Sequence, residues 1–125
     1  MVRPPSVTPV LLVTDLQRSL DFYIRVLGYE DPAVHGDPPC FAMINRDGLD
    51  LMLSLAEGSS KPHPNGAHGV WDFHLRVSDL AADMARISAA GVAIDRGPTD
   101  TFYEMREIEV LDPDGYRICL GQDLR

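Results

Sequence analysis

The sequence is poor in cysteine, and it lacks any long apolar run. Its 125 residues include two cysteines, Cys40 and Cys119, which do not form a C-x-x-C pair. A chain of this length can bury a core without cross-links, so we expect two free thiols in a reducing compartment. Apolar stretches such as Val10 to Val13 are far too short to cross a membrane, and residues 1–8 contain no apolar signal core. We therefore predict a cytoplasmic protein with no membrane partner.

Positive charge is also scarce. Eleven lysines and arginines stand against nineteen aspartates and glutamates, which gives a formal net charge of −8. A phosphate backbone would repel such a chain, so we expect no nucleic-acid partner. The acidic balance favours a cationic ligand, although a charged surface maintained for solubility explains it more simply.

The sequence repeats itself with a shift of 77 − 13 = 64 residues. Val13-Thr14-Asp15-Leu16 recurs as Val77-Ser78-Asp79-Leu80, and the same shift places Tyr23 on Ile87. Apolar residues in the first copy follow a helical spacing, which predicts an amphipathic helix with one buried stripe. The residues of this stripe are Leu16, Leu20, Tyr23 and Leu27.

Short polar residues precede both predicted helices. Thr14 can accept a hydrogen bond from an unpaired backbone amide, and Gln17 three residues later completes a capping box. Ser78 can cap the second helix in the same way. Gly28 and Gly91 follow the apolar stripes and would end the helices in a left-handed conformation, which makes the second helix about one residue shorter.

Alternating segments around each helix predict strands. In the first half these are residues 7–13, 29–34, 40–45 and 49–55, and in the second half residues 70–77, 93–96, 105–111 and 116–121. A segment rich in glycine, serine and proline begins at Glu57 and is interpreted as a linker. We therefore predict one α+β domain, residues 1–125, with a βαβββ repeat at 6–56, a linker at 57–68 and a second βαβββ repeat at 69–123.

Two motifs resemble those of a known superfamily. Residues 13–23 (VTDLQRSLDFY), followed by Val26-Leu27-Gly28, are similar to the opening signature of the vicinal-oxygen-chelate superfamily, which contains glyoxalases, extradiol dioxygenases and bleomycin-resistance proteins. Residues 112–118 (DPDGYRI) resemble its closing hairpin. The resemblance implies a curled eight-stranded mixed sheet with helices on its outer face, two half-open cups and a homodimer. It does not imply a reaction, because the superfamily includes both metal enzymes and metal-free binding proteins.

Strand periodicity assigns side chains to the two faces of the sheet. In residues 49–55 every odd position is leucine, which should pack on the helices and leave the even positions facing the cup. In residues 70–77 the apolar row begins at Trp71, which should pack against a helix, although its size could bring one edge to the pocket. The side chains that this alternation directs into the cup are Asp50, Met52, Ser54, Asp72, His74, Arg76, Glu107, Glu109, Arg117 and Cys119.

Metal enzymes of the superfamily place histidine or glutamate at four cup-facing positions. The resemblance assigns these positions to Thr8, to Asp50 or Met52, to Asp72 and to Cys119. None of these residues is a histidine or a glutamate, and threonine, aspartate and thiolate together match no common divalent site. We therefore predict no metal and no cofactor.

His74 lies beside an expected ligand position. As a general base or metal ligand it would need Asp72, Glu107 or Glu109 within reach, and the simpler interpretation is a polar residue in the wall of the cup. Cys119 has no histidine near it in the sequence, so we interpret it as a small buried residue rather than a nucleophile.

Aromatic side chains mark the predicted binding site. Phe41 and Tyr103 lie at or near strand ends, where rings could stack on a flat or cationic ligand, although Phe41 also suits the core. We predict a metal-free small-molecule binding protein of the bleomycin-resistance type. Its predicted ligand-binding residues are Phe41, Asp50, Met52, Asp72, His74, Tyr103, Glu107 and Cys119. Two alternatives stay open: a metal-dependent lyase, isomerase or dioxygenase centred on His74, and a dimeric module with a vestigial cup that recruits another protein.

Overall fold

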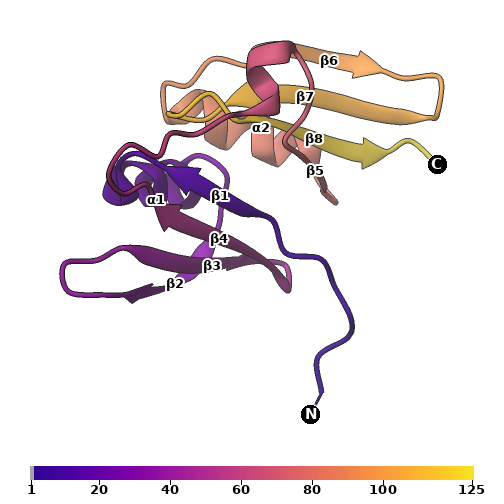
Figure 1. Cartoon of the computed structure of the whole chain (residues 1–125). Coiled ribbons are helices and arrows are strands. Elements are labelled where there is room, and N and C mark those ends of the chain that lie inside the picture. The colour runs from indigo at the N-terminus through magenta and orange to yellow at the C-terminus, as the bar shows by residue number, and fades with distance from the viewer. Residues whose placement is uncertain (1) are drawn as a thin grey trace.

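The computed structural model describes residues 2–125 as two α-helices, one 3-10 helix and eight strands (Figure 1). The first half contains β1 (Val10–Val13), α1 (Leu16–Arg25), β2 (Glu30–His35), β3 (Phe41–Arg46) and β4 (Leu49–Leu55). The second half contains η1 (Asn65–His68), β5 (Phe73–Arg76), α2 (Leu80–Ala89), β6 (Arg96–Asp100), β7 (Met105–Leu111) and β8 (Arg117–Asp123). The predicted α+β class and the two βαβββ repeats are confirmed.

The strands form two four-stranded sheets, with the orders β1-β4-β3-β2 and β5-β8-β7-β6. In each sheet the first strand of the repeat pairs with the last in parallel, and the other pairings are antiparallel. Helix α1 packs on β3 and β4, and α2 packs on β8, so each sheet has one covered face and one open face. The described strands do not close into a barrel.

One apolar core joins the two repeats, as the repeat pattern requires. The stripe of α1 is buried as predicted, and Ile87 of α2 occupies the corresponding position in the second repeat. Within β4, Leu51 and Leu53 are fully buried, whereas Leu49 at the start of the strand is exposed. The predicted alternation of buried leucines therefore holds within β4 and fails at its first residue.

Polar contacts across the repeats reinforce this core. The buried Tyr23 hydroxyl donates a 2.6 Å hydrogen bond to the Asp112 carboxylate, which also accepts backbone N–H bonds within its own hairpin. Burial is the main cause that raises the pKa values of both Tyr23 and Asp112. Arg46 donates two hydrogen bonds of 2.8 and 2.9 Å to the buried Asp83 of α2. These contacts fix the two repeats against each other.

The predicted N-caps Thr14 and Ser78 are wrong by one residue. Asp15 and Asp79 cap α1 and α2, because each carboxylate accepts the backbone N–H three residues later and also favours the positive end of the helix dipole. The Thr14 hydroxyl instead donates to Asp114 at 2.6 Å. Both helices contain ten residues, so the second is not shorter. Neither is long and apolar enough to cross a membrane.

Predicted and observed strand boundaries agree best in the central strands of each sheet and worst in the edge strands. Strands β4 and β7 have the predicted bounds, whereas β6 lies at Arg96–Asp100 instead of 93–96. Pro98 lacks an N–H group, and the pairing of β6 shifts between Arg96 and Thr99. A proline is tolerated there because β6 is an exposed edge strand.

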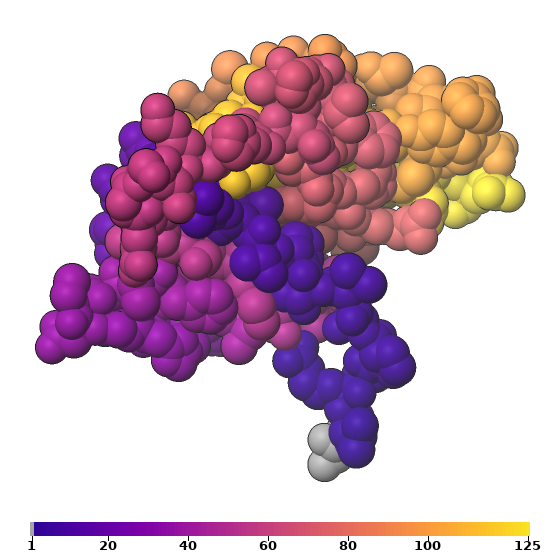
Figure 2. All heavy atoms as spheres, viewed as in Figure 1, coloured from indigo at the N-terminus to yellow at the C-terminus, as the bar shows by residue number. Residues whose placement is uncertain are grey.

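Residues 2–9 precede β1, and their N-terminal part projects from the body of the molecule (Figure 2). Arg3 ties this segment to the first sheet, because its guanidinium donates to Asp50 at 2.9 Å and to the Gly48 carbonyl at 3.1 Å. The segment exposes Val2 and Val7, two apolar side chains for which one chain provides no cover.

Replacing Tyr23 by phenylalanine should lower the free energy of unfolding by about 1–3 kcal/mol, because the buried Asp112 carboxylate loses a donor. Urea denaturation measures this change. Tyr29→Phe is the matched control: Tyr29 is also buried, burial raises its pKa to about 12, and no side-chain hydrogen bond contributes to that shift. An equal loss in both variants would show that the bond to Asp112 is not responsible.

Candidate functional site

The open faces of the two sheets differ in chemistry. In the first sheet the half-buried open face pairs Phe41 with Ser54, Met43 with Met52, and Asn45 with Asp50, so apolar side chains lie beside one hydrogen-bonded polar pair. In the second sheet the open face carries a histidine, carboxylates and a thiol. Within residues 2–125, a histidine, a carboxylate and a thiol therefore come together only on the second sheet.

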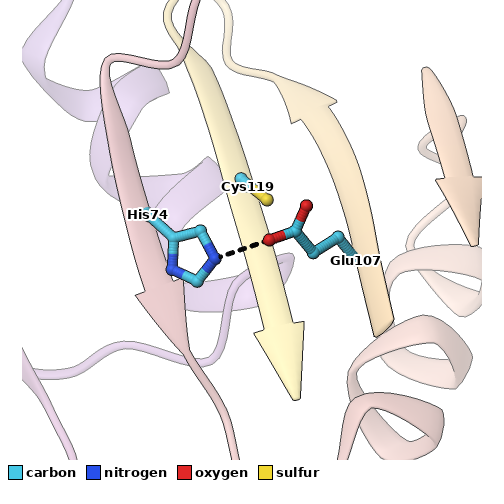
Figure 3. A group of neighbouring side chains, drawn as sticks. All are labelled: His74, Glu107 and Cys119. Carbon is cyan, nitrogen blue, oxygen red and sulfur yellow. Dashed lines mark hydrogen bonds and ion pairs between the residues drawn. The ribbon is translucent and has the colours of Figure 1, made fainter. Parts of the chain in front are cut away.

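A hydrogen bond between two strands that are not neighbours lies at the centre of this polar face. His74 on β5 lies opposite Cys119 of β8, and Glu107 on β7 lies opposite Gly121 of β8. The His74 Nε2 atom nevertheless lies 3.1 Å from Glu107 Oε2, across the intervening strand (Figure 3). If Glu107 is ionised it can only accept, so Nε2 carries the proton and Nδ1 of a neutral ring is left as an acceptor.

The absence of a side chain at Gly121 permits this contact. A Cβ atom at this position would lie 2.8 Å from His74 Nε2 and 2.9 Å from Met105 Cε. Both distances are shorter than real carbon contacts allow. Gly121 therefore leaves the space through which the imidazole reaches over β8 to Glu107.

Aromatic rings adjoin both members of the pair. The Trp71 ring lies 5.1 Å from the His74 ring, in a tilted arrangement. The Tyr103 hydroxyl donates to Glu107 and lies 2.7 Å from each carboxylate oxygen, and this hydrogen bond is the main cause that raises the pKa of Tyr103 to about 12. Trp71 was expected to pack on a helix, and this is wrong, because it precedes β5 and contacts the polar face.

Strand alternation directs Cys119 toward the cup, and the sequence analysis interprets it as a small buried residue. Its burial is confirmed, because its exposed fraction is 0%. Burial is the largest cause that raises the pKa of its thiol to about 12, and the negative charges of Glu107 and Glu109 add to the shift. A thiol in this state is neutral at physiological pH and a poor nucleophile, as the sequence indicated.

Arg117, predicted to be exposed, is buried and held by acidic side chains. One of its terminal nitrogens lies 2.6 Å from Asp95 and 3.0 Å from Glu109, and these hydrogen bonds raise its pKa. The positive charge of Arg117 is therefore paired with these carboxylates inside the protein. The carboxylate of Glu109 is compensated by the same contact.

Asp72 and Asp50, two predicted ligand-binding residues, hold the backbone and other side chains instead. Asp72 accepts three backbone N–H bonds of 2.7 to 3.0 Å, two from the start of η1 and one from Arg117. Asp50 accepts hydrogen bonds from Arg3 and Asn45. The four positions implied by the superfamily resemblance therefore do not offer a set of free metal ligands, and the residues there do not fit the metal of its enzymes.

The structure thus divides the predicted site. It brings His74, Tyr103, Glu107 and Cys119 together, and it places Phe41, Asp50 and Met52 on the other sheet. The sequence analysis missed Gly121 as part of the site and gave Trp71 only as an alternative to helix packing. For Gly121, a signal existed: a glycine at an open-face position of β8 leaves room between His74 and Glu107 once the strand pairing is known.

The cavity next to His74 is small, about 90 Å³, and lies between the repeats. Drug-sized ligands need several hundred cubic ångströms, so such a ligand would have to spread over the open face as well. A hollow of about 640 Å³ lies elsewhere, between the first turn of α2 and strands β6 and β7. Of its charged residues, Asp79 caps α2, and the exposed Asp100 and Arg106 are already paired with each other, so it offers no comparable cluster.

Residues 6–120 match the family model described as the Glyoxalase/Bleomycin resistance protein/Dioxygenase superfamily. The chain belongs to this superfamily. The resemblance seen in the two motifs is thereby confirmed. An uncharacterised protein of Mycobacterium bovis is 27% identical over 135 residues, which cover 97% of this chain and 85% of the relative.

Solved structures with a similar fold cover nearly the whole chain. TnmS3, an antibiotic-binding protein from Streptomyces sp. CB03234, is 29% identical with a TM-score of 0.73, and the match covers 98% of this chain and 99% of that chain. TioX from Micromonospora sp. ML1 is 23% identical with a TM-score of 0.74, and the match covers 97% of this chain and all of the other. The second similarity shows the fold alone.

Replacing Gly121 by alanine should displace the His74 ring from Glu107 and lower the free energy of unfolding by about 1–3 kcal/mol, because the added methyl group overpacks the face. Denaturation and a crystal structure of the variant measure both effects. The same substitution in a His74→Ala background is the control and should cost less, because the opposing ring is absent. An unchanged cost in that background would contradict the assigned role of Gly121.

Proposed function

We propose that this protein captures a small organic molecule on the open face of its second sheet, without a metal ion. The molecule has a flat ring and a positive charge or hydrogen-bond donor. The observation that carries the proposal is the buried carboxylate of Glu107, flanked by His74, Tyr103 and the nearby Trp71. The mechanism is binding rather than bond making.

The charge of Glu107 favours a cationic or donor group. The residue is 7% exposed, and within residues 2–125 its ion-pair partner is His74, with no lysine or arginine in contact. A buried carboxylate is costly unless a cation or donor compensates it. A ligand ammonium or donor N–H would provide that compensation in the cup.

The aromatic rings favour a flat ligand. Trp71 and Tyr103 adjoin opposite members of the His74–Glu107 pair, and Phe102 packs edge-on against Tyr103 at a centroid distance of 5.0 Å. Phe102 is 97% exposed at the tip of the β6–β7 hairpin. Such rings can stack on a planar molecule and enclose a positive charge.

Independence from metal is supported by the hydrogen bonds of Asp72 and Asp50. Their carboxylates are used by backbone amides and by neighbouring side chains, so a metal of the kind found in related enzymes would have to break these bonds. The similarity to TnmS3 suggests the ligand class, because that protein is antibiotic-binding. We therefore propose an antibiotic-like molecule as the ligand.

We also propose that the protein forms a homodimer that completes the cup. Exposed apolar side chains support this, among them Val2 and Val7 on the projecting segment and Phe102 on the hairpin. The 90 Å³ cavity in one chain is too small for a drug-sized ligand, so a second chain could provide the missing wall. Sedimentation equilibrium should give the mass of two chains, and a single-chain mass at micromolar concentration would contradict this arrangement.

Dye binding tests the capture proposal, because the protein contains a single tryptophan. After dialysis against a chelator, proflavine, a flat cationic dye, should quench the fluorescence of Trp71 to saturation. Anilinonaphthalene sulfonate, an aromatic anion, should bind at least about tenfold more weakly. Its sulfonate is repelled by the Glu107 carboxylate, whereas the positive charge of proflavine is attracted to it.

Glu107→Gln should weaken proflavine binding by about tenfold or more, because a hydrogen bond to a charged group contributes about 1.5–3 kcal/mol. Glu57→Gln, an exposed carboxylate of the linker, is the matched control and should leave binding unchanged. Equal affinity for the two dyes, or a Glu107→Gln variant that binds like the parent, would refute the assigned site. Binding that requires an added metal ion would refute metal independence.

A further inference from the structure

Three different metal-binding side chains converge on the open face of the second sheet (Figure 3). The ligand atoms of His74, Glu107 and Cys119 all lie within 4.8 Å of one another, and this is the one such group of three within residues 2–125. They come from three adjacent strands, β5, β7 and β8, so the sheet itself fixes their relative positions.

The spacing is close to that of a zinc site. Zinc binds nitrogen and oxygen at about 2.0–2.2 Å and sulfur at about 2.3 Å, which separates tetrahedral donor atoms by about 3.3–3.7 Å. His74 and Glu107 are already 3.1 Å apart. The thiol would have to approach by about 1 Å, a movement within reach of side-chain rotation.

The local charge also suits a divalent cation. Glu107 and Glu109 both lie near the Cys119 thiol and act on it electrostatically. Arg117 compensates Glu109, whereas within residues 2–125 the buried Glu107 pairs with the His74 imidazole and accepts a hydrogen bond from the neutral Tyr103 hydroxyl. The cluster therefore has two groups that can bind a cation in their negatively charged forms, the Glu107 carboxylate and the Cys119 thiolate. It contains no lysine or arginine.

We propose that His74, Glu107 and Cys119 bind a zinc ion. On binding, the neutral imidazole moves its proton from Nε2 to Nδ1, the thiol releases its proton to solvent, and the carboxylate binds as it is. Zinc with one carboxylate and one thiolate has no net charge, which reduces the cost of holding the ion at a buried site. His74 is 26% exposed, so water can take the fourth position from the open side.

This site differs from the one implied by the superfamily resemblance. It shares Cys119 with that set of four positions but uses His74 in place of Asp72, and it recruits Glu107 from β7. The inference does not depend on the capture of an organic molecule, which is proposed to occur without metal. Both proposals use Glu107 and His74, so zinc and the cationic ligand would compete for the same face, and each is therefore measured in the absence of the other.

Metal titration of the full-length protein tests the site. Zinc should bind one ion per chain with a Kd below about 10 µM in competition with a chromophoric chelator. Cobalt, used as a spectroscopic probe, should give the near-ultraviolet absorption of a thiolate–cobalt bond. Cys119→Ser should abolish this absorption and weaken zinc binding by about 100-fold or more, since changes even outside the ligand shell cost 10–100-fold.

Cys40→Ser is the matched control and should retain both the absorption and the zinc affinity. Cys40 is a free cysteine that directly precedes β3 of the first sheet, and it lies outside the cluster. His74→Gln is a second variant and should weaken zinc binding without altering the fold, as judged by circular dichroism. Absence of zinc binding in the parent protein, or cobalt absorption that survives in Cys119→Ser, would overturn the proposal. Dye binding is measured on chelator-treated protein and zinc binding is measured without dye, so failure of zinc binding and failure of dye capture can be told apart.

Discussion

The contact between His74 and Glu107 across β8 is the interaction on which the site depends. It joins strands that are not neighbours, and it exists because Gly121 presents no side chain between them. The Tyr103 hydroxyl donates a hydrogen bond to the carboxylate, and the Trp71 ring lies against the imidazole. The His74–Glu107 pair therefore positions both rings. Without this contact the polar face would be a set of separate side chains rather than one cluster.

The position of the pair follows from the fold of the repeat. Each sheet uses one face to pack on its helix, and the alternation of strand residues then sends every second side chain to the open face. The same topology produces an open face with Phe41, Met43 and Met52 in the first repeat and one with His74, Glu107 and Cys119 in the second. Duplication therefore supplied two equivalent surfaces, and the residues at the open positions gave them different chemistry.

Sequence reasoning succeeded where periodicity and motifs carry the information. The buried stripe of α1, the bounds of β4 and β7, and the repeated topology all follow from alternating or helical spacing. It failed where neighbouring residues compete for one role. Thr14 and Asp15 can both cap a helix, and the choice depends on Asp114, a hundred residues away. Likewise, parity places Asp72 inside the cup, but the backbone amides of Asn65, Gly66 and Arg117 donate to its carboxylate.

The central claim is that the second sheet, rather than the first, forms the binding surface. Backbone amide chemical shifts, recorded during titration of isotopically labelled protein with a flat cationic ligand, test this claim residue by residue. The account predicts that the largest shifts fall on β5, β7 and β8, around His74, Glu107 and Gly121. Shifts confined to β3 and β4, around Phe41 and Met52, would contradict it.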